Sequence, residues 1–231
     1  MTSLASAVRN VLSAVPEVSR LTSVRRTTSL FSQDQPADSV YFLEDGLVKL
    51  TRTNHSGGRI ILGICGPGQI IGEEVLANDA ASYYAEAEIL SQSSLLRVPK
   101  DAMLRAMVSN PELSNALVTF LLERKLALAQ KVELLCLHDV EYRILFYLAE
   151  LSKLVKPQDD GEGYQLPITQ LELADLIGAT RETTSTTLNQ LERRGLVKLS
   201  RRLLTVPSPV TLRSAAMAKV APANGNSGHV S

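Results

Sequence analysis

Cysteine and histidine are scarce in this chain, which has two Cys and three His among 231 residues. The cysteines, Cys65 and Cys136, lie far apart in the sequence, so one chain cannot supply the four thiolates of an iron–sulfur site. The histidines, His55, His138 and His229, are equally scattered and lack the spacing of metal ligands. We therefore expect neither a metal nor a cofactor. Both cysteines are interpreted as small buried residues, with a redox-sensing thiol as the alternative.

Long apolar runs, signal features and catalytic motifs are also missing. The longest apolar stretch, around residues 60–71, is interrupted by glycines and a proline and is too short to cross a bilayer. The first twenty residues lack the basic region, apolar core and cleavage site of a secretory signal. The sequence contains no P-loop and no HExxH helix. We therefore expect a cytoplasmic protein that is not an enzyme and does not contact a membrane.

The N-terminal half consists of short apolar runs separated by turn residues. Residues 4–15 are predicted to form a short amphipathic helix, because Leu4, Val8 and Leu12 recur at helical spacing. The stretches that predict strands and their turns are VYFLEDGLVKLTRTN (40–54), SGGRIILGI (56–64), GPGQIIGEEVL (66–76, ending in a short helix) and AEAEILSQSSLLRV (85–98). Regularly spaced short strands of this kind predict a barrel or a double-sheet roll.

A long helix is predicted to follow, beginning near Pro111 and extending to about residue 136. Six of its residues are spaced three and four apart, as in the seam of a two-stranded coiled coil with one charged interruption. These seam residues are Val118, Leu121, Lys125, Leu128, Val132 and Leu135. The pattern favours a homodimer, and the alternative is a helix packed on its own domain.

Positive charge gathers near the C-terminus, although the whole chain has 24 basic and 24 acidic residues. In the segment of residues 178–206 the basic residues are Arg181, Arg193, Arg194, Lys198, Arg201 and Arg202, and the acidic residues are Glu182 and Glu192. Charge runs are usually solvated helix faces, but this one lies within a patterned segment.

That segment predicts two short helices and a hairpin. Thr169 and Glu172 fit a capping box at the start of the first helix, and Gly178 can end it. The second helix, about 181–193, has few apolar positions, so much of its surface faces outward. LVKLSRRLLTV (196–206) then predicts a hairpin with basic residues at its tip. Together these elements predict a winged helix-turn-helix, with a structural helical hairpin as the alternative.

The order of these elements resembles the Crp/Fnr regulators over residues 20–208. The motifs that carry the resemblance are YFLEDGLVKL (41–50), GPGQIIGEE (66–74), LLRVP (95–99), NPEL (110–113), DVEYRI (139–144) and, most specific, ITQLELADLIGATRET (168–183). NPELS and LTVPSPVTL are similar to the cyanobacterial nitrogen-control branch. The resemblance implies an α+β protein with a β-roll sensor domain like those that bind cyclic nucleotides. The implied divisions are an N-terminal helical segment (1–20), the β-roll (21–108), a dimerisation helix (109–138), a winged helix-turn-helix (139–208) and a tail expected to be disordered (209–231).

The resemblance also implies a transcription factor that binds a palindromic operator in double-stranded DNA as a homodimer, with RNA polymerase as a partner. In the cyclic-AMP-binding relatives an Arg-Glu pair and a second Arg four residues beyond the Glu read bases. Arg181 and Glu182 match the pair, but the third position is Thr186, which is too short for the same contact. We therefore expect a changed preference in the inner half-site. The candidate DNA-binding residues are Thr169, Thr180, Arg181, Glu182, Thr183, Ser185, Thr186, Thr187, Arg201 and Arg202.

The sensor side departs further from the cyclic-nucleotide binders. Gly72-Glu73 matches their ribose-binding pair, but their phosphate-binding Arg-Ser aligns with Tyr83-Tyr84 and their adenine-binding Thr-Ser with Leu128-Ala129. We expect an effector other than cyclic AMP, or none. The candidate pocket residues are Gly72, Glu73, Glu74, Tyr83, Tyr84, Arg124, Lys125 and Leu128. The alternatives are glutamates that pair within the roll, and a surface or seam position for Arg124 and Lys125 instead of contact with a carboxylate such as the 2-oxoglutarate of the nitrogen-control branch.

A second class of function fits the roll alone. A β-roll can act as a ligand-binding module on a protein partner without binding DNA, as in the regulatory subunits of kinases. Residues 168–206 argue against this reading, because those subunits lack a winged helix-turn-helix.

Overall fold

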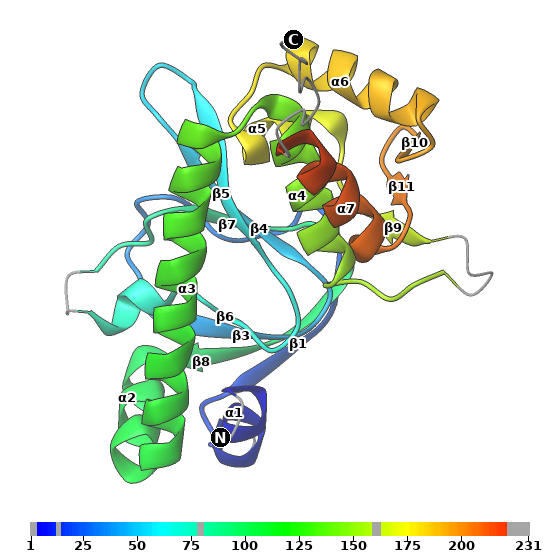
Figure 1. Cartoon of the computed structure of the whole chain (residues 1–231). Coiled ribbons are helices and arrows are strands. Elements are labelled where there is room, and N and C mark those ends of the chain that lie inside the picture. Colours follow the sequence, from blue (N-terminus) through cyan, green and yellow to red (C-terminus); the bar gives the residue numbers. More distant parts are fainter. Residues whose placement is uncertain (1–3, 13–14, 78–80, 159–162, 221–231) are drawn as a thin grey trace, which may run out of the picture. The chain divides into compact units, whose positions relative to one another are not determined.

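Strands build most of the first half of the chain, and helices build most of the second (Figure 1). The computed structural model describes residues 4–12, 15–77, 81–158 and 163–220. The chain divides into two compact units, Met1–Glu133 and Leu134–Ser231. Within the described residues, no helix combines the length and hydrophobicity that a bilayer-spanning segment needs.

The first unit is a roll of two four-stranded antiparallel sheets, as predicted. Its elements are α1 (Leu4–Leu12), β1 (Ser19–Val24), β2 (Ser29–Phe31), β3 (Ser39–Asp45), β4 (Val48–Thr53), β5 (Arg59–Cys65), β6 (Ile70–Ile71), the 3-10 helix η1 (Glu73–Leu76), β7 (Glu86–Ile89), β8 (Ser93–Pro99), α2 (Lys100–Ser109) and α3 (Pro111–Leu137). The strand orders are β1-β8-β3-β6 and β2-β7-β4-β5. Strands β1 and β2 were not predicted as separate elements, and α1 ends at Leu12, before the predicted residue 15.

Strand β3 holds the first unit together because both of its faces are buried. Successive side chains of a strand point to opposite sides. Val40 and Phe42 therefore pack into the cluster formed with α1, α2 and the start of α3. Tyr41 and Leu43 pack into the cluster inside the roll, between the two sheets. The β-roll thus has one core inside it and a second core between one sheet and the helices.

Gly46 makes the turn from β3 to β4 that the Asp45-Gly46 pair predicts. Its φ is 89°, in the left-handed region that favours glycine. A Cβ atom at this position would lie 2.1 Å from Ser93 Oγ and 2.5 Å from the carbonyl oxygen of Gln92. The close approach of the neighbouring strand therefore requires glycine here.

Tyr83 is a core residue of the roll. Only 1% of it is exposed, and its ring stacks on Phe31 with the ring centroids 3.7 Å apart. Its hydroxyl donates to the Ser39 carbonyl oxygen at 2.6 Å and accepts from the Ser39 N–H at 3.2 Å. Burial raises the pKa of Tyr83 to about 12. These bonds fix the start of β3 to the segment before β7.

The second unit contains the helix-turn-helix and its hairpin. Its elements are α4 (Val140–Ser152), β9 (Tyr164–Leu166), α5 (Gln170–Ile177), α6 (Arg181–Arg193), β10 (Lys198–Leu199), β11 (Leu204–Val206) and α7 (Pro209–Val220). The three strands form one antiparallel sheet in the order β10-β11-β9. The helices bury their apolar positions together, including Leu148 of α4, Leu173 of α5 and Leu188 of α6.

Helix α7 corrects the expectation of a disordered tail from residue 209. Its Leu212 and Ala216, four residues apart, are buried. Arg213 forms an ion pair with Glu150 of α4 at 2.6 Å. The Ala-rich composition that suggested disorder also has high helix propensity, and a few apolar positions are enough to dock such a helix. Residues 221–231 of the expected tail lie outside the described residues.

The buried hydroxyl of Tyr83 gives a stability prediction. Tyr83→Phe removes it and leaves the buried N–H and carbonyl of Ser39 without this partner, so the free energy of unfolding should fall by about 1–3 kcal/mol. Tyr84→Phe is the matched control, because Tyr84 is 61% exposed, and it should change stability by less than about 0.5 kcal/mol. Urea titrations of both variants measure the difference, and equal stabilities would contradict the assigned role.

Candidate nucleic-acid interface and sensor pocket

Local capping fixes the start of α5. Thr169 Oγ1 accepts from the Glu172 N–H at 3.1 Å, and Glu172 Oε2 accepts from the Thr169 N–H at 2.9 Å, which confirms the capping box. Gly178 then ends the helix with φ 63°. A Cβ atom on Gly178 would lie 2.8 Å from a Leu135 methyl carbon, so the turn has no room for a side chain.

Helix α6 begins directly after this turn and presents one polar face. Thr180 caps it, because its Oγ1 accepts from the Thr183 N–H at 3.1 Å. Leu188 and Leu191 are fully buried and define the inner face. The predicted residues Thr180, Arg181, Glu182, Thr183 and Thr186 are exposed, and Ser185 is half-buried. The exposed set lies around the N-terminal turn, where free backbone N–H groups and the helix dipole favour negative charge.

Thr187 is placed differently from the prediction. It is buried, and its hydroxyl donates to the Thr183 carbonyl oxygen at 2.8 Å. Thr184 is buried in the same way and donates to the Thr180 carbonyl oxygen at 2.9 Å. Both threonines lie on the side of α6 that carries Leu188 and Leu191, so Thr187 has no free hydroxyl for a phosphate.

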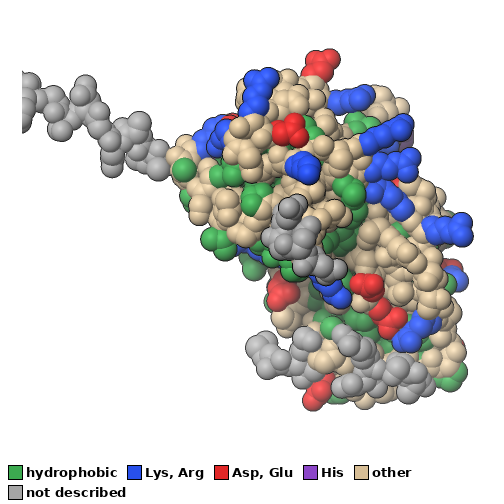
Figure 2. All heavy atoms as spheres, turned by 90° about the vertical axis from the view of Figure 1, so that its right-hand side faces the viewer, with side chains coloured by type: hydrophobic (Ala, Val, Ile, Leu, Met, Phe, Trp, Pro, Cys, Tyr) green, Lys and Arg blue, Asp and Glu red, His purple; other side chains and the backbone are tan. Residues whose placement is uncertain are grey.

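The hairpin after α6 presents two arginines at its tip. Ser200 closes the turn, since its N–H and its hydroxyl both donate to the Leu203 carbonyl oxygen, at 3.1 and 2.8 Å. Arg201 and Arg202 lie in this turn and are exposed. Figure 2 shows Lys and Arg side chains gathered on this side of the molecule. The hairpin and α6 therefore share a basic surface.

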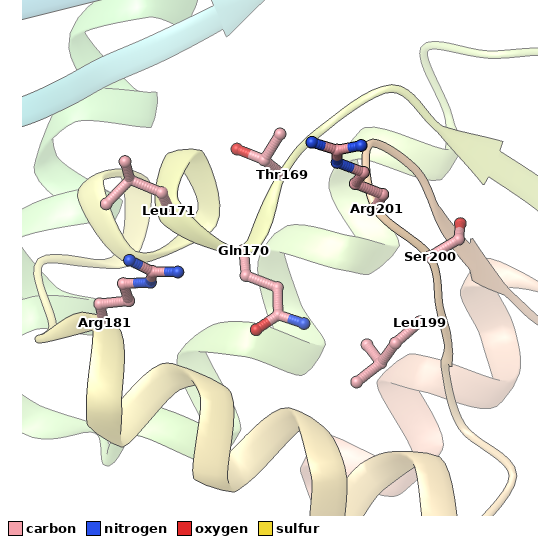
Figure 3. Close-up of a pocket in the computed structure, with 7 residues that line it drawn as sticks. All are labelled: Thr169, Gln170, Leu171, Arg181, Leu199, Ser200 and Arg201. Atoms are coloured by element: carbon pink, nitrogen blue, oxygen red, sulfur yellow. The ribbon is translucent and has the colours of Figure 1, made fainter.

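A hollow of about 410 Å³ lies between these elements. Its lining residues are Thr169, Gln170, Leu171, Arg181, Leu199, Ser200 and Arg201. Figure 3 shows Leu171 and Arg181 on one side of it and Arg201 across from them. The structure thus brings together the predicted Thr169, Arg181 and Arg201.

Gln170, Leu171, Leu199 and Ser200 were missed by sequence reasoning. The available signal for the first two was their place directly after the capping Thr169, which puts them in the first turn of α5. Guanidinium groups, hydroxyls and two helix N-termini around one hollow suit the phosphates and base edges of a nucleic acid.

In the roll, the candidate sensor residues are paired with one another. Arg124 of α3 forms an ion pair with Glu73 of η1, with 3.0 Å between Nε and Oε1. The side chains are only 25% and 15% exposed, and burial raises the pKa of the Glu73 carboxyl. Glu74 Oε1 accepts from the Tyr84 N–H at 3.0 Å. These contacts favour the alternative that both glutamates pair within the roll, and they place Arg124 in an ion pair there and not at an exposed surface position.

Tyr83 and Gly72 fill space in the roll instead of lining an opening. Gly72 has φ 80°, and a Cβ on it would lie 2.8 Å from the Tyr83 ring. The Tyr83 hydroxyl is already bonded to the Ser39 backbone, and contact between Tyr83 and an effector stays a prediction. Tyr84 is exposed, and the guanidinium of Arg52 lies 4.5 Å from the centre of its ring.

One stripe of α3 is apolar and exposed. The predicted seam residues Val118, Leu121, Leu128 and Val132 are 40–61% exposed, Lys125 is exposed, and Leu135 is half-buried. In contrast, Lys131 is buried and donates to the Ile61 carbonyl oxygen at 2.6 Å, and burial lowers its pKa to about 8. Helix α3 thus packs one side on the roll and leaves an apolar stripe outside.

Both units match known protein families. Residues 21–110 match the cyclic nucleotide-binding domain, and residues 142–215 match the Crp-like helix-turn-helix domain. The two matches cover the β-roll and the helix-turn-helix with its hairpin.

Two curated relatives and one solved structure illustrate the likeness. The chain is 29% identical over 189 residues to the global nitrogen regulator of Synechococcus elongatus, covering 81% of this chain and 85% of that protein. It is 27% identical over 175 residues to the CRP-like cAMP-activated global transcriptional regulator of Mycobacterium tuberculosis, covering 75% and 78%. The structure of the c-di-GMP responsive global regulator CLP of Xanthomonas campestris aligns with a TM-score of 0.73 at 23% identity, covering 88% of this chain and 99% of that chain. This last likeness supports the fold alone.

The paired groups of the roll give a ligand prediction. Cyclic AMP should not bind measurably, because its phosphate charge must leave water while Arg124 is already paired with Glu73 and Tyr83 is bonded to Ser39. Leu128 also offers no hydrogen bond to a base. Calorimetry with millimolar cyclic AMP tests this, with 5′-AMP as the control for non-specific nucleotide binding. Low-micromolar binding of cyclic AMP would show that the internal pairs open readily for a ligand.

Proposed function

We propose that this chain, which belongs to the Crp/Fnr family of transcription regulators, acts as a homodimer on a palindromic operator in double-stranded DNA. The observation that carries the proposal is the exposed N-terminal turn of α6 beside the basic hairpin tip. A recognition helix enters the major groove with this turn, and the hairpin then contacts the flanking backbone. RNA polymerase is the proposed further partner, and the cytoplasm is the proposed location.

Arg181 and Glu182 are the proposed base readers. Arg181 can donate two hydrogen bonds to N7 and O6 of a guanine, and Glu182 can accept from N4 of a cytosine. Both side chains are exposed at the first turn of α6. Thr186 lies one turn further along the exposed face and is too short to replace an Arg, so the proposed operator shares an outer half-site with relatives and differs inside.

The positioning contacts come from hydroxyls and from the hairpin. The hydroxyls of Thr180 and Thr183 form a hydrogen bond at the start of α6, with 2.9 Å between their Oγ1 atoms. Ser185 on α6 and Arg201 and Arg202 on the hairpin are proposed to contact phosphates, which set the register without reading sequence. Thr169 is proposed to contribute through the start of α5, since Thr169 and Gln170 both line the hollow.

The apolar stripe of α3 supports the dimer. A soluble chain rarely leaves such a stripe in water, and a second copy of the same helix covers it most simply. A two-fold dimer would also present two α6 helices, as binding to two half-sites about one DNA turn apart, roughly 34–36 Å, requires.

The proposed effector is a small molecule other than cyclic AMP, or none. The relatives differ in this respect by their own names, which mention nitrogen control and activation by cAMP. The competing function is a roll that regulates a protein partner without binding DNA. It does not explain the basic surface of α6 and the hairpin. A gel shift with genomic fragments at stated salt separates the two.

The assigned DNA contacts predict two different mutant phenotypes. Arg181→Ala should weaken binding to the preferred site by about 1–3 kcal/mol and flatten discrimination at one base pair. Arg202→Ala should weaken binding to all sequences alike and lower the slope of log affinity against log salt by about one. Binding curves on matched and mutated duplexes at several salt concentrations measure both. Equal losses for both variants on every duplex would show that the roles are wrongly divided.

The α3 stripe predicts the oligomeric state. Leu128→Asp would place two unpaired carboxylates in the apolar seam, so the variant should be a monomer that binds operator DNA poorly. Val108→Asp is the control, because Val108 is 86% exposed on α2 and outside the seam, and it should stay dimeric. Light scattering decides the outcome, and a stable Leu128→Asp dimer would exclude this seam.

A further inference from the structure

We propose that Leu171 reads a thymine methyl group next to the base pair that Arg181 contacts. This inference rests on the proposed function, because it assumes that α6 enters the major groove. It assigns sequence preference to the first helix of the helix-turn-helix, through a residue that sequence reasoning did not select.

Leu171 is exposed where packing gives no reason for a leucine. It lies in the first turn of α5 and is 50% exposed, whereas the residues after it, Glu172, Leu173 and Ala174, are buried. Its side chain therefore contributes little to the core of the unit. Of the large apolar side chains that the structure describes as exposed in 134–220, which are Leu137, Leu171, Val210 and Met217, Leu171 alone lines the hollow.

The neighbours of Leu171 define what it would meet. Arg181 lies on the same side of the hollow (Figure 3), and Arg201 and Ser200 line it from the hairpin. Because Leu171 and Arg181 line the same side of the hollow, we infer that Leu171 approaches a base step next to the one whose guanine edge Arg181 contacts.

The chemistry selects thymine among the groups available there. An isobutyl side chain forms no hydrogen bond, so placing it against phosphate oxygens would remove water from charged atoms without compensation. In the major groove, the 5-methyl group of thymine is the apolar feature that a base pair presents. Contact between the two methyl-bearing groups removes apolar surface from water on both sides.

The test compares thymine with uracil, which differ in duplex DNA by this methyl group. The full-length protein first selects its preferred sequence from a pool of random duplexes. Each thymine of the selected duplex is then replaced by deoxyuridine, one position at a time, and affinities are measured at fixed salt. We expect one replacement, next to the guanine whose recognition is lost in Arg181→Ala, to weaken binding about fourfold, the value of one buried methyl group.

Variants assign the methyl contact to a residue. Leu171→Gln should bind the thymine and uracil duplexes equally, and Leu171→Met, which stays apolar, should keep the difference. Val210→Gln is the matched control, since Val210 is 72% exposed on α7 and does not line the hollow. Thr186→Ser removes a threonine methyl group on the exposed face of α6, beyond its first turn, and should also keep the difference.

The outcomes separate this inference from the proposed function. If a sequence is selected but no thymine methyl matters, or if the methyl effect disappears in Thr186→Ser and persists in Leu171→Gln, the role of Leu171 is wrong and sequence-specific binding stands. If no sequence is selected from the pool, the proposed function fails and the inference fails with it.

Discussion

The left-handed turn at Gly178 is the constraint on which the basic surface depends. Three residues, Gly178, Ala179 and Thr180, separate α5 from α6, and Gly178 has no room for a Cβ atom because Leu135 lies against it. Because the connection is so short, both helices bury their apolar sides against α4 while their first turns remain outside. Arg143 of α4 reinforces the same corner, since it donates to the Ile177 carbonyl oxygen at 2.7 Å. The short backbone connection therefore fixes the position of the first turn of α6 relative to the first turn of α5.

Sequence patterns predicted the features that depend on neighbouring residues. The capping box at Thr169 and the turns at Gly46 and Gly178 are local, and the structure confirms them. Regularly spaced short strands predicted a barrel or a double-sheet roll, and helical spacing predicted the long helix; the structure has the roll and the helix. The orientation of Thr187 was not predicted, because threonine is neither clearly apolar nor charged, although its spacing of four from Leu191 gave a signal that it faces inward.

Contacts between segments that are distant in the chain could not be predicted from the sequence. The bond between Tyr83 and Ser39 connects residues 44 positions apart, and the hollow at Leu171 is formed by α5, α6 and the hairpin together. Helix α7 was missed because composition was taken as evidence of disorder, whereas its ion pairs to α4 depend on tertiary placement. In each case the missing information was which partner a side chain would find.

In the roll, the partner of a charged side chain also comes from a distant segment. The resemblance to cyclic-nucleotide binders implied a ligand contact for Glu73, whereas in the structure Glu73 is paired with Arg124 from α3. A second atom of that carboxylate, Oε2, is buried and has no hydrogen-bond partner within the described residues. Such a group keeps an unfavourable desolvation term in the folded state. The first unit therefore keeps one buried acceptor without a hydrogen bond, next to α3, the helix that carries the apolar stripe.

Lys219 of α7 links the last helix of the second unit to its first. It pairs with Asp139, the N-cap of α4, at 2.7 Å and with Glu141 at 2.8 Å, and Glu141 also pairs with Arg194 at the C-cap of α6. One carboxylate thus joins three helices. The consequence is practical: fusion partners, purification tags or deletions that disturb residue 219 would remove the ion pairs between α7 and the start of α4, so expression plasmids for DNA-binding work should carry their additions at the amino terminus.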